Sequence, residues 1–69
     1  MKTLQVDGLK VAELRERKGW TQHTTGRRAG ISRALVSAIE VGDRQPSAQV
    51  AMQLAEALGC DLDDLLVVS

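Results

Sequence analysis

The sequence predicts an all-α domain built from five helices. Its composition is rich in Ala, Leu, Arg, Glu and Gln, residue types that favour helices. Trp20 is the only aromatic residue, whereas strands favour aromatic and β-branched side chains. Apolar residues recur at helical spacing between glycines and the Ser, Thr or Asp residues that begin helices. The 69 residues make one small domain, which is marginal unless it is well packed or oligomeric.

Short connections join the five expected helices. These helices span residues 9–18, 22–29, 33–41, 48–58 and 62–67. A residue that caps helix N-termini stands at each start: Asp7, Thr21, Ser32, Ser47 and Asp61. The domain is expected to cover residues 7–69. Residues 1–6 are expected to form an N-terminal arm, for which a disordered or loosely docked state is favoured over a brief edge strand.

The helix over residues 22–29 is the weakest of the five. Gly26 lies in its interior, where glycine costs about 1 kcal/mol relative to alanine. Thr24 and Thr25 are modest helix formers, and its inner face offers only Thr25 and Ala29 for burial. On this basis Gly26→Ala is expected to stabilise the domain.

Charge is divided unevenly along a chain whose net charge is zero. Residues 1–44 hold all nine basic residues and five acidic ones, a net of +4. Residues 45–69 hold four acidic residues and no base, a net of −4. Such asymmetry can steer a polyanion to one side of a protein. Charge alone does not distinguish this from an unevenly charged solvated surface.

The residue inventory argues against an enzyme, a metal site and a cofactor. The single His23 and the single Cys60 are far apart, which suits neither a metal site nor a Cys/His catalytic pair. No glycine-rich phosphate loop or small-molecule site is evident. No apolar run reaches the roughly 18–20 residues of a membrane span. A lone cysteine also suits a reducing compartment, so a cytoplasmic protein is expected.

Residues 22–42 predict a helix-turn-helix that binds double-stranded DNA. A short helix, a turn opened by Gly30 and a second helix ending at Gly42 follow one another. The second helix has an inner side of Val36 and Ile39 and a slim outer side, which suits a major groove roughly 12 Å wide. Leu35 is ambiguous between a thymine methyl contact and the edge of the core. The candidate base-reading residues are Arg33, Ala34, Leu35, Ser37 and Ala38.

Phosphate contacts are expected around both motif helices. The helix over 22–29 would lie across the DNA backbone with its N-terminus aimed at a phosphate. The candidate phosphate-binding residues are Thr21, Gln22, Arg28, Ser32, Arg44 and Gln45. Arg27 and Arg28 are explained equally well as a solvated helix face. His23 is expected at the surface and Trp20 in the core.

Four stretches together resemble the Cro and phage-repressor class of helix-turn-helix domains, the XRE-type family. They are LRERKGWTQ (14–22), AGIS (29–32), IEVGDRQPS (39–47) and LAEALGCDLDDLL (54–66). The resemblance implies a compact, lambda-repressor-like fold with the motif in its second and third helices. It also implies a shielded salt bridge between Arg15 and Glu40.

Two residues depart from the family pattern. The family usually has a Leu-like residue where Thr25 stands and Ala where Gly26 stands. Both changes are expected to weaken the helix over 22–29. The Thr25 hydroxyl could be satisfied by the carbonyl four residues back.

The resemblance and the residues together predict a sequence-specific transcriptional regulator that binds a DNA operator; a repressor is favoured, and the sequence does not distinguish it from an activator. The alternatives are an adaptor or antitoxin-like interaction module that keeps the fold without reading DNA, and the DNA-binding part of a larger regulator. A homodimer is expected, because two-fold dimers usually read paired half-sites. Its predicted surface comprises Leu62, Leu66, Val67 and Val68. Alternatively, Leu62, Leu65 and Leu66 simply close the core.

Overall fold

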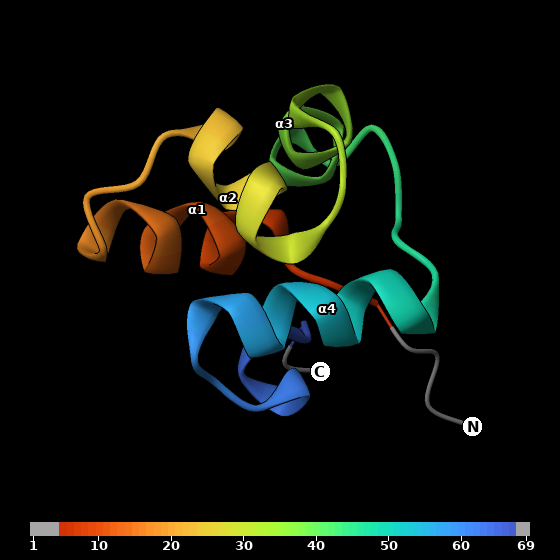
Figure 1. Ribbon diagram of the computed structural model, residues 1–69. Coiled ribbons are helices and arrows are strands. Elements are labelled where there is room, and N and C mark those ends of the chain that lie inside the picture. Colours follow the sequence, from red (N-terminus) through yellow and green to blue (C-terminus); the bar gives the residue numbers. More distant parts are fainter. Residues whose placement is uncertain (1–4, 68–69) are drawn as a thin grey trace.

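Four α-helices and one short 3-10 helix make up the fold in a computed structural model that describes residues 5–67 (Figure 1). The elements are α1 (Gly8–Arg17), α2 (Gln22–Ala29), α3 (Arg33–Val41), α4 (Ala48–Leu58) and η1 (Leu62–Leu65). The all-α class is confirmed. The expected fifth α-helix over 62–67 is wrong, since only a single 3-10 turn forms there. Leu66 is already extended, with ψ 150°, because it pairs with Val6 instead of continuing the helix.

The helix starts follow the predicted caps. The side chains of Asp7, Thr21, Ser32 and Ser47 accept backbone N–H groups of the first turns of α1, α2, α3 and α4. Asp61 and Asp64 form a reciprocal capping box at η1. These local bonds explain why the observed bounds of the α-helices lie within one residue of the expected ones.

The core lies between the helix-turn-helix pair and the other helices. In Figure 1, α2 and α3 lie above α1 and α4, and η1 lies beneath α4. The largest fully buried apolar side chains come from α1, α3, α4 and η1: Val11, Val36, Ile39, Leu54 and Leu65. α2 contributes only small buried residues, namely Thr25, Gly26 and Ala29. The angle of α2 therefore depends on close approach and hydrogen bonds more than on large apolar side chains.

The two ends of the described chain meet in a short antiparallel pairing, which we call the terminal ladder (residues 5–7 and 65–67). Val6 and Leu66 form its central bridge. The Asp7 amide donates to the Leu65 carbonyl at 2.7 Å, and the Val67 amide donates to the Gln5 carbonyl at 2.9 Å. Val6 is buried. This part of the expected arm is thus packed rather than loosely docked, and residues 1–4 lie outside the described part.

Gly26 lies where α2 touches the turn that leads to α3. Its backbone is helical, but a Cβ placed there would lie 2.7 Å from the Ile31 carbonyl oxygen and 3.2 Å from the Ser32 carbonyl carbon. Backbone atoms cannot move aside as a flexible side chain can. This geometry argues against the expectation that Gly26→Ala stabilises the domain, because the methyl group would crowd the turn.

Gly8 makes a similar approach at the start of α1. A Cβ there would overlap the carbonyl oxygen of Ile39 near the end of α3. The absent side chain lets α1 and α3 come together backbone to backbone, beside the Arg15–Glu40 pair predicted between the same two helices.

Candidate nucleic-acid interface

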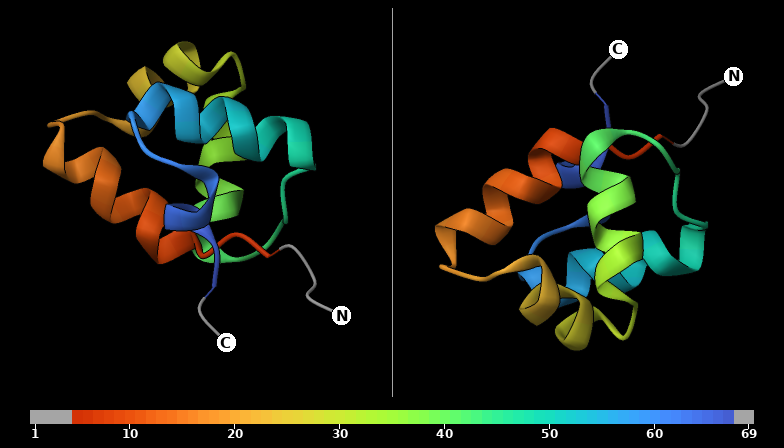
Figure 2. Two further views of the ribbon diagram at one scale, coloured as in Figure 1. Left: turned by 90° about the horizontal axis from the view of Figure 1, so that it is seen from below. Right: turned by 90° about the horizontal axis from the view of Figure 1, so that it is seen from above.

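The helix-turn-helix presents two adjacent helices on one face of the molecule (Figure 2). Gly30 adopts the left-handed conformation with φ 76°, which ends α2 and starts the turn. The Ile31 amide then donates to the Gly26 carbonyl at 2.9 Å, and the Ile31 side chain packs against the core. The turn is therefore fixed at both of its ends, and with it the relative placement of α2 and α3.

α3 separates an anchored side from a free side. Val36 and Ile39 are fully buried, whereas Arg33 and Ala34 are exposed. Ser37 and Ala38 are half-buried, and both have small side chains. Leu35 is half-buried and packs against the core, which places it at the core edge. The outer side of α3 is slim enough to lie in a groove.

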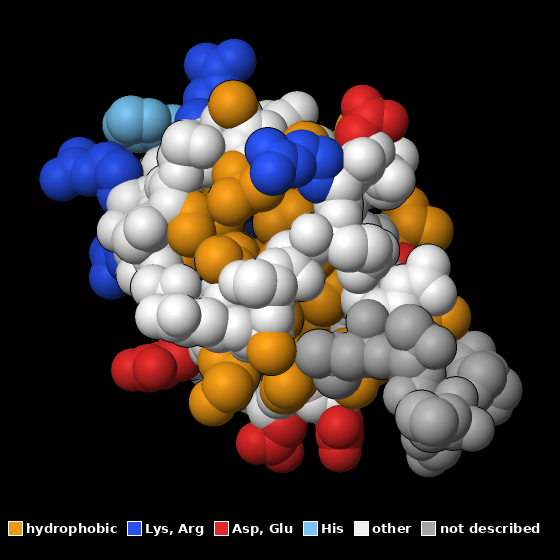
Figure 3. All heavy atoms as spheres, turned by 90° about the vertical axis from the view of Figure 1, so that its right-hand side faces the viewer, with side chains coloured by type: hydrophobic (Ala, Val, Ile, Leu, Met, Phe, Trp, Pro, Cys, Tyr) orange, Lys and Arg blue, Asp and Glu red, His pale blue; other side chains and the backbone are white. Residues whose placement is uncertain are grey.

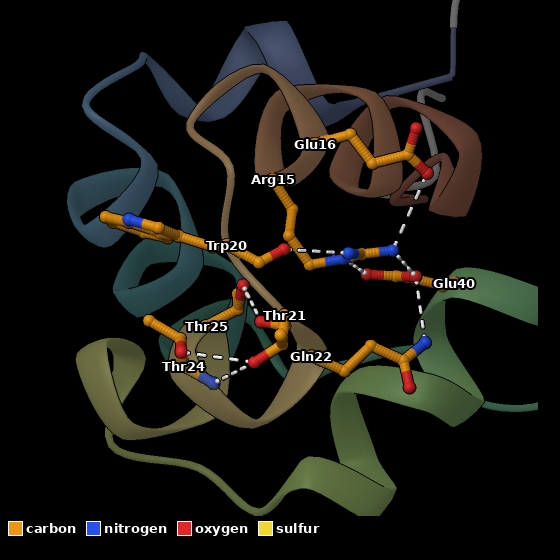
Figure 4. Close-up of polar contacts among 8 residues, drawn as sticks. All are labelled: Arg15, Glu16, Trp20, Thr21, Gln22, Thr24, Thr25 and Glu40. Carbon is orange, nitrogen blue, oxygen red and sulfur yellow. Dashed lines mark hydrogen bonds and ion pairs between the residues drawn. The ribbon is translucent and has the colours of Figure 1, made fainter.

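The Arg15–Glu40 ion pair that the resemblance implies is present (Figure 4). Arg15 Nε donates to Glu40 Oε2 at 2.7 Å, and Nη2 donates to Oε1 at 3.1 Å, so the pair is bidentate. Only 15% of the Arg15 side chain and 7% of the Glu40 side chain are exposed. The hydrogen bond to Glu40 raises the pKa of Arg15 above its ordinary value, against the opposing effect of burial. The pair therefore ties α1 to α3 in its charged form.

Gln22 joins this pair to the start of α2. Its Nε2 donates to Glu40 Oε1 at 3.0 Å, while Arg15 Nη1 donates to the Trp20 carbonyl at 2.9 Å (Figure 4). Three elements thus converge on one carboxylate. One of the two amide N–H groups of Gln22 is used in this way, which leaves the other as a donor for a phosphate.

The hydroxyls around α2 are largely occupied within the helix. Thr25 Oγ1 donates to the Thr21 carbonyl at 3.0 Å, as predicted, and Thr25 is fully buried. Thr21 Oγ1 accepts from the Thr24 amide and donates to Thr24 Oγ1 at 3.1 Å. Ser32 differs, because its oxygen accepts the Leu35 amide and its own O–H is left to donate. Of the two predicted phosphate-binding hydroxyls, Ser32 is the better donor.

The Trp20 ring contacts two cationic side chains, Lys18 after α1 and Arg28 in α2. The ring is half-buried against the core instead of fully inside it. Arg28 Cζ lies 5.0 Å and Lys18 Nζ lies 5.1 Å from the ring centroid, within the range of cation–π attraction. Arg28 also lines a shallow hollow with Thr24 and Arg27 on the outer face of α2. Arg28 is therefore better positioned than a freely solvated arginine.

The loop after α3 carries Arg44 and Gln45. The amides of Asp43 and Arg44 both donate to the Ala38 carbonyl, at 2.9 and 3.3 Å, and the Arg44 side chain is exposed. The Gln45 amide group instead binds the Val6 backbone twice, at 2.8 and 3.1 Å. Gln45 was predicted to bind a phosphate, but its Oε1 and one of its two amide N–H groups are bound to the Val6 backbone. No sequence spacing signals this contact, because 39 residues separate its partners.

Charge is unevenly distributed over the face of the molecule drawn in Figure 3. In Figure 3, basic side chains project mainly from the upper part, where α2 and α3 lie, and acidic ones gather mostly at the lower end, near η1. On the face drawn in Figure 3, the basic side chains of residues 1–44 and the acidic ones of residues 45–69 thus lie mostly in different parts of the surface. An excess of basic side chains on the helix-turn-helix part of a surface favours the approach of a polyanion.

Features of other functions are not found in the described chain. Among residues 5–67, no three His, Cys, Asp or Glu side chains gather where they could hold a metal ion. No helix in that range is long and apolar enough to cross a membrane. Burial, followed by the charges of Asp64 and Asp61, raises the pKa of the Cys60 thiol, which disfavours the nucleophilic thiolate.

The fold and this face define a helix-turn-helix domain. The chain belongs to the helix-turn-helix family, whose model matches residues 11–65. It is 39% identical over 56 residues to YgzD of Bacillus subtilis (strain 168), described as an uncharacterized HTH-type transcriptional regulator. That match covers 81% of this chain and 85% of YgzD.

Solved structures share the same arrangement. The restriction-modification controller protein C.AhdI of Aeromonas hydrophila superposes with a TM-score of 0.83 at 34% identity, over 86% of this chain and 89% of that one. The P22 c2 repressor, solved in complex with a synthetic operator, superposes with a TM-score of 0.84 at 27% identity, over 90% of this chain and 94% of that one. The lambda-repressor-like fold predicted from the sequence is confirmed.

Proposed function

We propose that this protein regulates transcription, as a repressor, by binding a double-stranded DNA operator with α3 in the major groove. The observation that carries the proposal is the division of α3 into a buried side of Val36 and Ile39 and a slim free side that begins with Arg33. A groove-binding helix needs both sides, one to hold its angle and one to reach base edges. The P22 c2 repressor, bound to its operator in a fold of TM-score 0.84, supports the same use.

We assign the contacts with DNA base edges to residues on the free side of α3. Arg33 stands at its N-terminal end, where a guanidinium can bind guanine O6 and N7 together. Ala34 and Ala38 keep the helix close to the bases, and Ser37 supplies a hydroxyl. Leu35, which packs at the core edge, contributes at most a methyl contact with thymine.

Phosphate binding is assigned to residues that flank the groove. Gln22 retains one free amide N–H at the start of α2, and Ser32 retains its hydroxyl proton. Arg44 follows α3 with an exposed side chain. Arg28 approaches from the flank of α2, steadied by Trp20. Together these donors would hold the register of α3 on the duplex without reading sequence.

A homodimer is proposed because one small domain of this kind offers few contacts. Leu62 and Leu66 are half-buried and pack against the core, so core closure accounts for part of their apolar area. Val67 keeps 44% of its surface exposed, and Met52 on α4 keeps 60%. Val68 lies outside the described residues. Sedimentation that gives a monomer at high micromolar concentration, with and without DNA, would exclude the dimer.

We further propose that the protein is not an enzyme and acts in the cytoplasm. The Cys60 thiol, held in its neutral form, is a poor nucleophile, and a free thiol suits a reducing compartment where DNA is reached. No cofactor or small-molecule ligand enters this function.

A salt series with random duplex DNA tests the proposal first. The affinity of a DNA-binding protein falls as the salt concentration rises. In a plot of the logarithm of the binding constant against the logarithm of the salt concentration, each phosphate neutralised contributes about −0.9 to the slope. Absence of binding at low salt would favour an interaction module instead. Selection from a random duplex pool, repeated with Arg33→Ala, tests base reading. The variant is expected to lose about 1–3 kcal/mol at one base position and little elsewhere.

A further inference from the structure

Gln45 occupies an unusual place between the DNA-facing loop and the two ends of the chain. Its Oε1 accepts the Val6 amide at 2.8 Å, and its Nε2 donates to the Val6 carbonyl at 3.1 Å. The side-chain amide thus pairs with Val6 as a neighbouring strand would. We call these two bonds the Gln45 clasp.

The clasp is backed by a rigid partner. Val6 is buried, and its other neighbours are held in the terminal ladder by the Asp7–Leu65 and Gln5–Val67 hydrogen bonds. Lys10 Nζ also donates to the Leu66 carbonyl at 3.1 Å. The two hydrogen bonds of the Gln45 clasp therefore hold the loop after α3 against a segment that is distant in the sequence.

The clasp restrains the backbone next to Arg44. On its N-terminal side, the amides of Asp43 and Arg44 are fixed to the Ala38 carbonyl in α3. On its C-terminal side stands the clasp. Arg44 is therefore the one exposed cation of a loop that is anchored immediately before and immediately after it. Without the second anchor, the Arg44 backbone would be tied to α3 alone.

We propose that Gln45 is a positioning residue, which acts through Val6 to fix the Arg44 loop so that Arg44 meets a DNA phosphate. This inference rests on the proposed DNA binding, and it replaces the direct phosphate contact expected of Gln45. Only a side chain with both a donor and an acceptor can make the clasp. Met has a similar length and neither group, so Gln45→Met removes the clasp and little else.

The first experiment measures amide exchange by NMR without DNA. In Gln45→Met, exchange of the Val6 amide should accelerate about tenfold, since its acceptor is lost, and the Arg44 amide should lose protection as well. Gln5→Met is the matched control, because the Gln5 side chain is exposed and makes no hydrogen bond with the described residues. Unchanged Arg44 protection in Gln45→Met would overturn the inference, whatever the protein binds.

The second experiment measures the salt dependence of binding to the duplex DNA selected from the random pool. Arg44→Ala and Gln45→Met should each reduce the slope by about 0.9, the value of one phosphate contact. The double variant should show no further reduction, because both substitutions remove the same contact. A lower melting temperature with an unchanged slope would mean that Gln45 is only structural. Gln45→Glu serves as a second variant, because it keeps an acceptor for the Val6 amide and loses the donor. Its Val6 amide should exchange at a rate between those of the wild type and Gln45→Met.

The two experiments separate two kinds of failure. If the wild-type protein shows no salt-dependent binding, the proposed function fails, and the exchange data still decide whether Gln45 fixes the loop. If the wild type binds with a steep slope and Gln45→Met binds identically, the proposed function stands and the positioning role is wrong.

Discussion

α2 and α3 belong to one motif but are held in place in different ways. α3 is anchored by large apolar side chains, Val36 and Ile39, which are buried to at least 99%. α2 buries only Thr25, Gly26 and Ala29, and is held by the Thr25 hydroxyl, the Gln22–Glu40 bond and its backbone contact with the turn. The difference indicates that α3 is stabilised by volume and α2 by geometry. Substitutions that remove buried volume should therefore destabilise α3, whereas substitutions that add volume or remove a hydrogen bond should destabilise α2.

The largest loss is expected from the volume that α3 buries. Ile39→Ala should lower the free energy of unfolding by about 3–4 kcal/mol, because it removes a fully buried side chain and leaves a cavity. Val41→Ala in the same helix should change it by less than about 0.5 kcal/mol, since Val41 is 69% exposed. Urea denaturation measures both. Equal effects of the two substitutions would contradict the anchoring role of Ile39.

The next loss is expected at the carboxylate that joins the two helices. Glu40→Ala should lower the free energy of unfolding by about 3 kcal/mol, because it leaves the shielded Arg15 guanidinium without its partner. Glu16→Ala is the control, since its side chain is 68% exposed and lies 3.7 Å from Arg15. An unchanged melting temperature for Glu40→Ala would show that the Arg15–Glu40 pair does not stabilise the fold.

A smaller loss is expected where α2 approaches the turn. Gly26→Ala gains about 1 kcal/mol of helix propensity. Crowding against the Ile31 carbonyl costs about 1–3 kcal/mol, so a net loss of about 1 kcal/mol is expected. Thermal denaturation should show a melting temperature lower by about 4–8 °C for a domain of this size. A rise would mean that the turn gives way easily and that the close approach does not fix α2.

The smallest effect is expected from the hydroxyl inside α2. Thr25→Val keeps the shape and removes the bond to the Thr21 carbonyl, which still accepts the Thr25 amide. The loss should be below about 1 kcal/mol. Thr25→Ser keeps the hydroxyl and loses the methyl, so comparing the two by denaturation separates hydrogen bonding from packing. A loss of several kcal/mol from Thr25→Val would show that the hydroxyl dominates.

Local patterns predicted the helices well, because caps and terminating glycines act within a few residues. Asp7, Thr21 and Ser32 could be recognised as caps from their position alone. The end of the chain was harder, since η1 stops at Leu65 only because Leu66 pairs with Val6 from the other terminus. No periodicity within residues 62–67 carries that contact.

Part of the geometry of the candidate site was also predictable. The sides of α3 follow from helical periodicity, and the Arg15–Glu40 pair followed from the family resemblance. The roles of Gly26 and Gln45 did not follow, because each depends on a backbone group brought near by the fold. Helix propensity treated Gly26 as a defect, whereas in the structure its missing side chain makes room for the turn.

The division of α3 also bears on how such proteins diversify. Val36 and Ile39 hold the helix against the core, while Arg33 and Ala34 are exposed on its free side. Surface positions of this kind tolerate substitution at little cost in stability. Under the proposed use of α3 in the major groove, substitutions at these exposed positions would change DNA preference while the domain keeps folding. A library of variants there can be screened without first restabilising the protein.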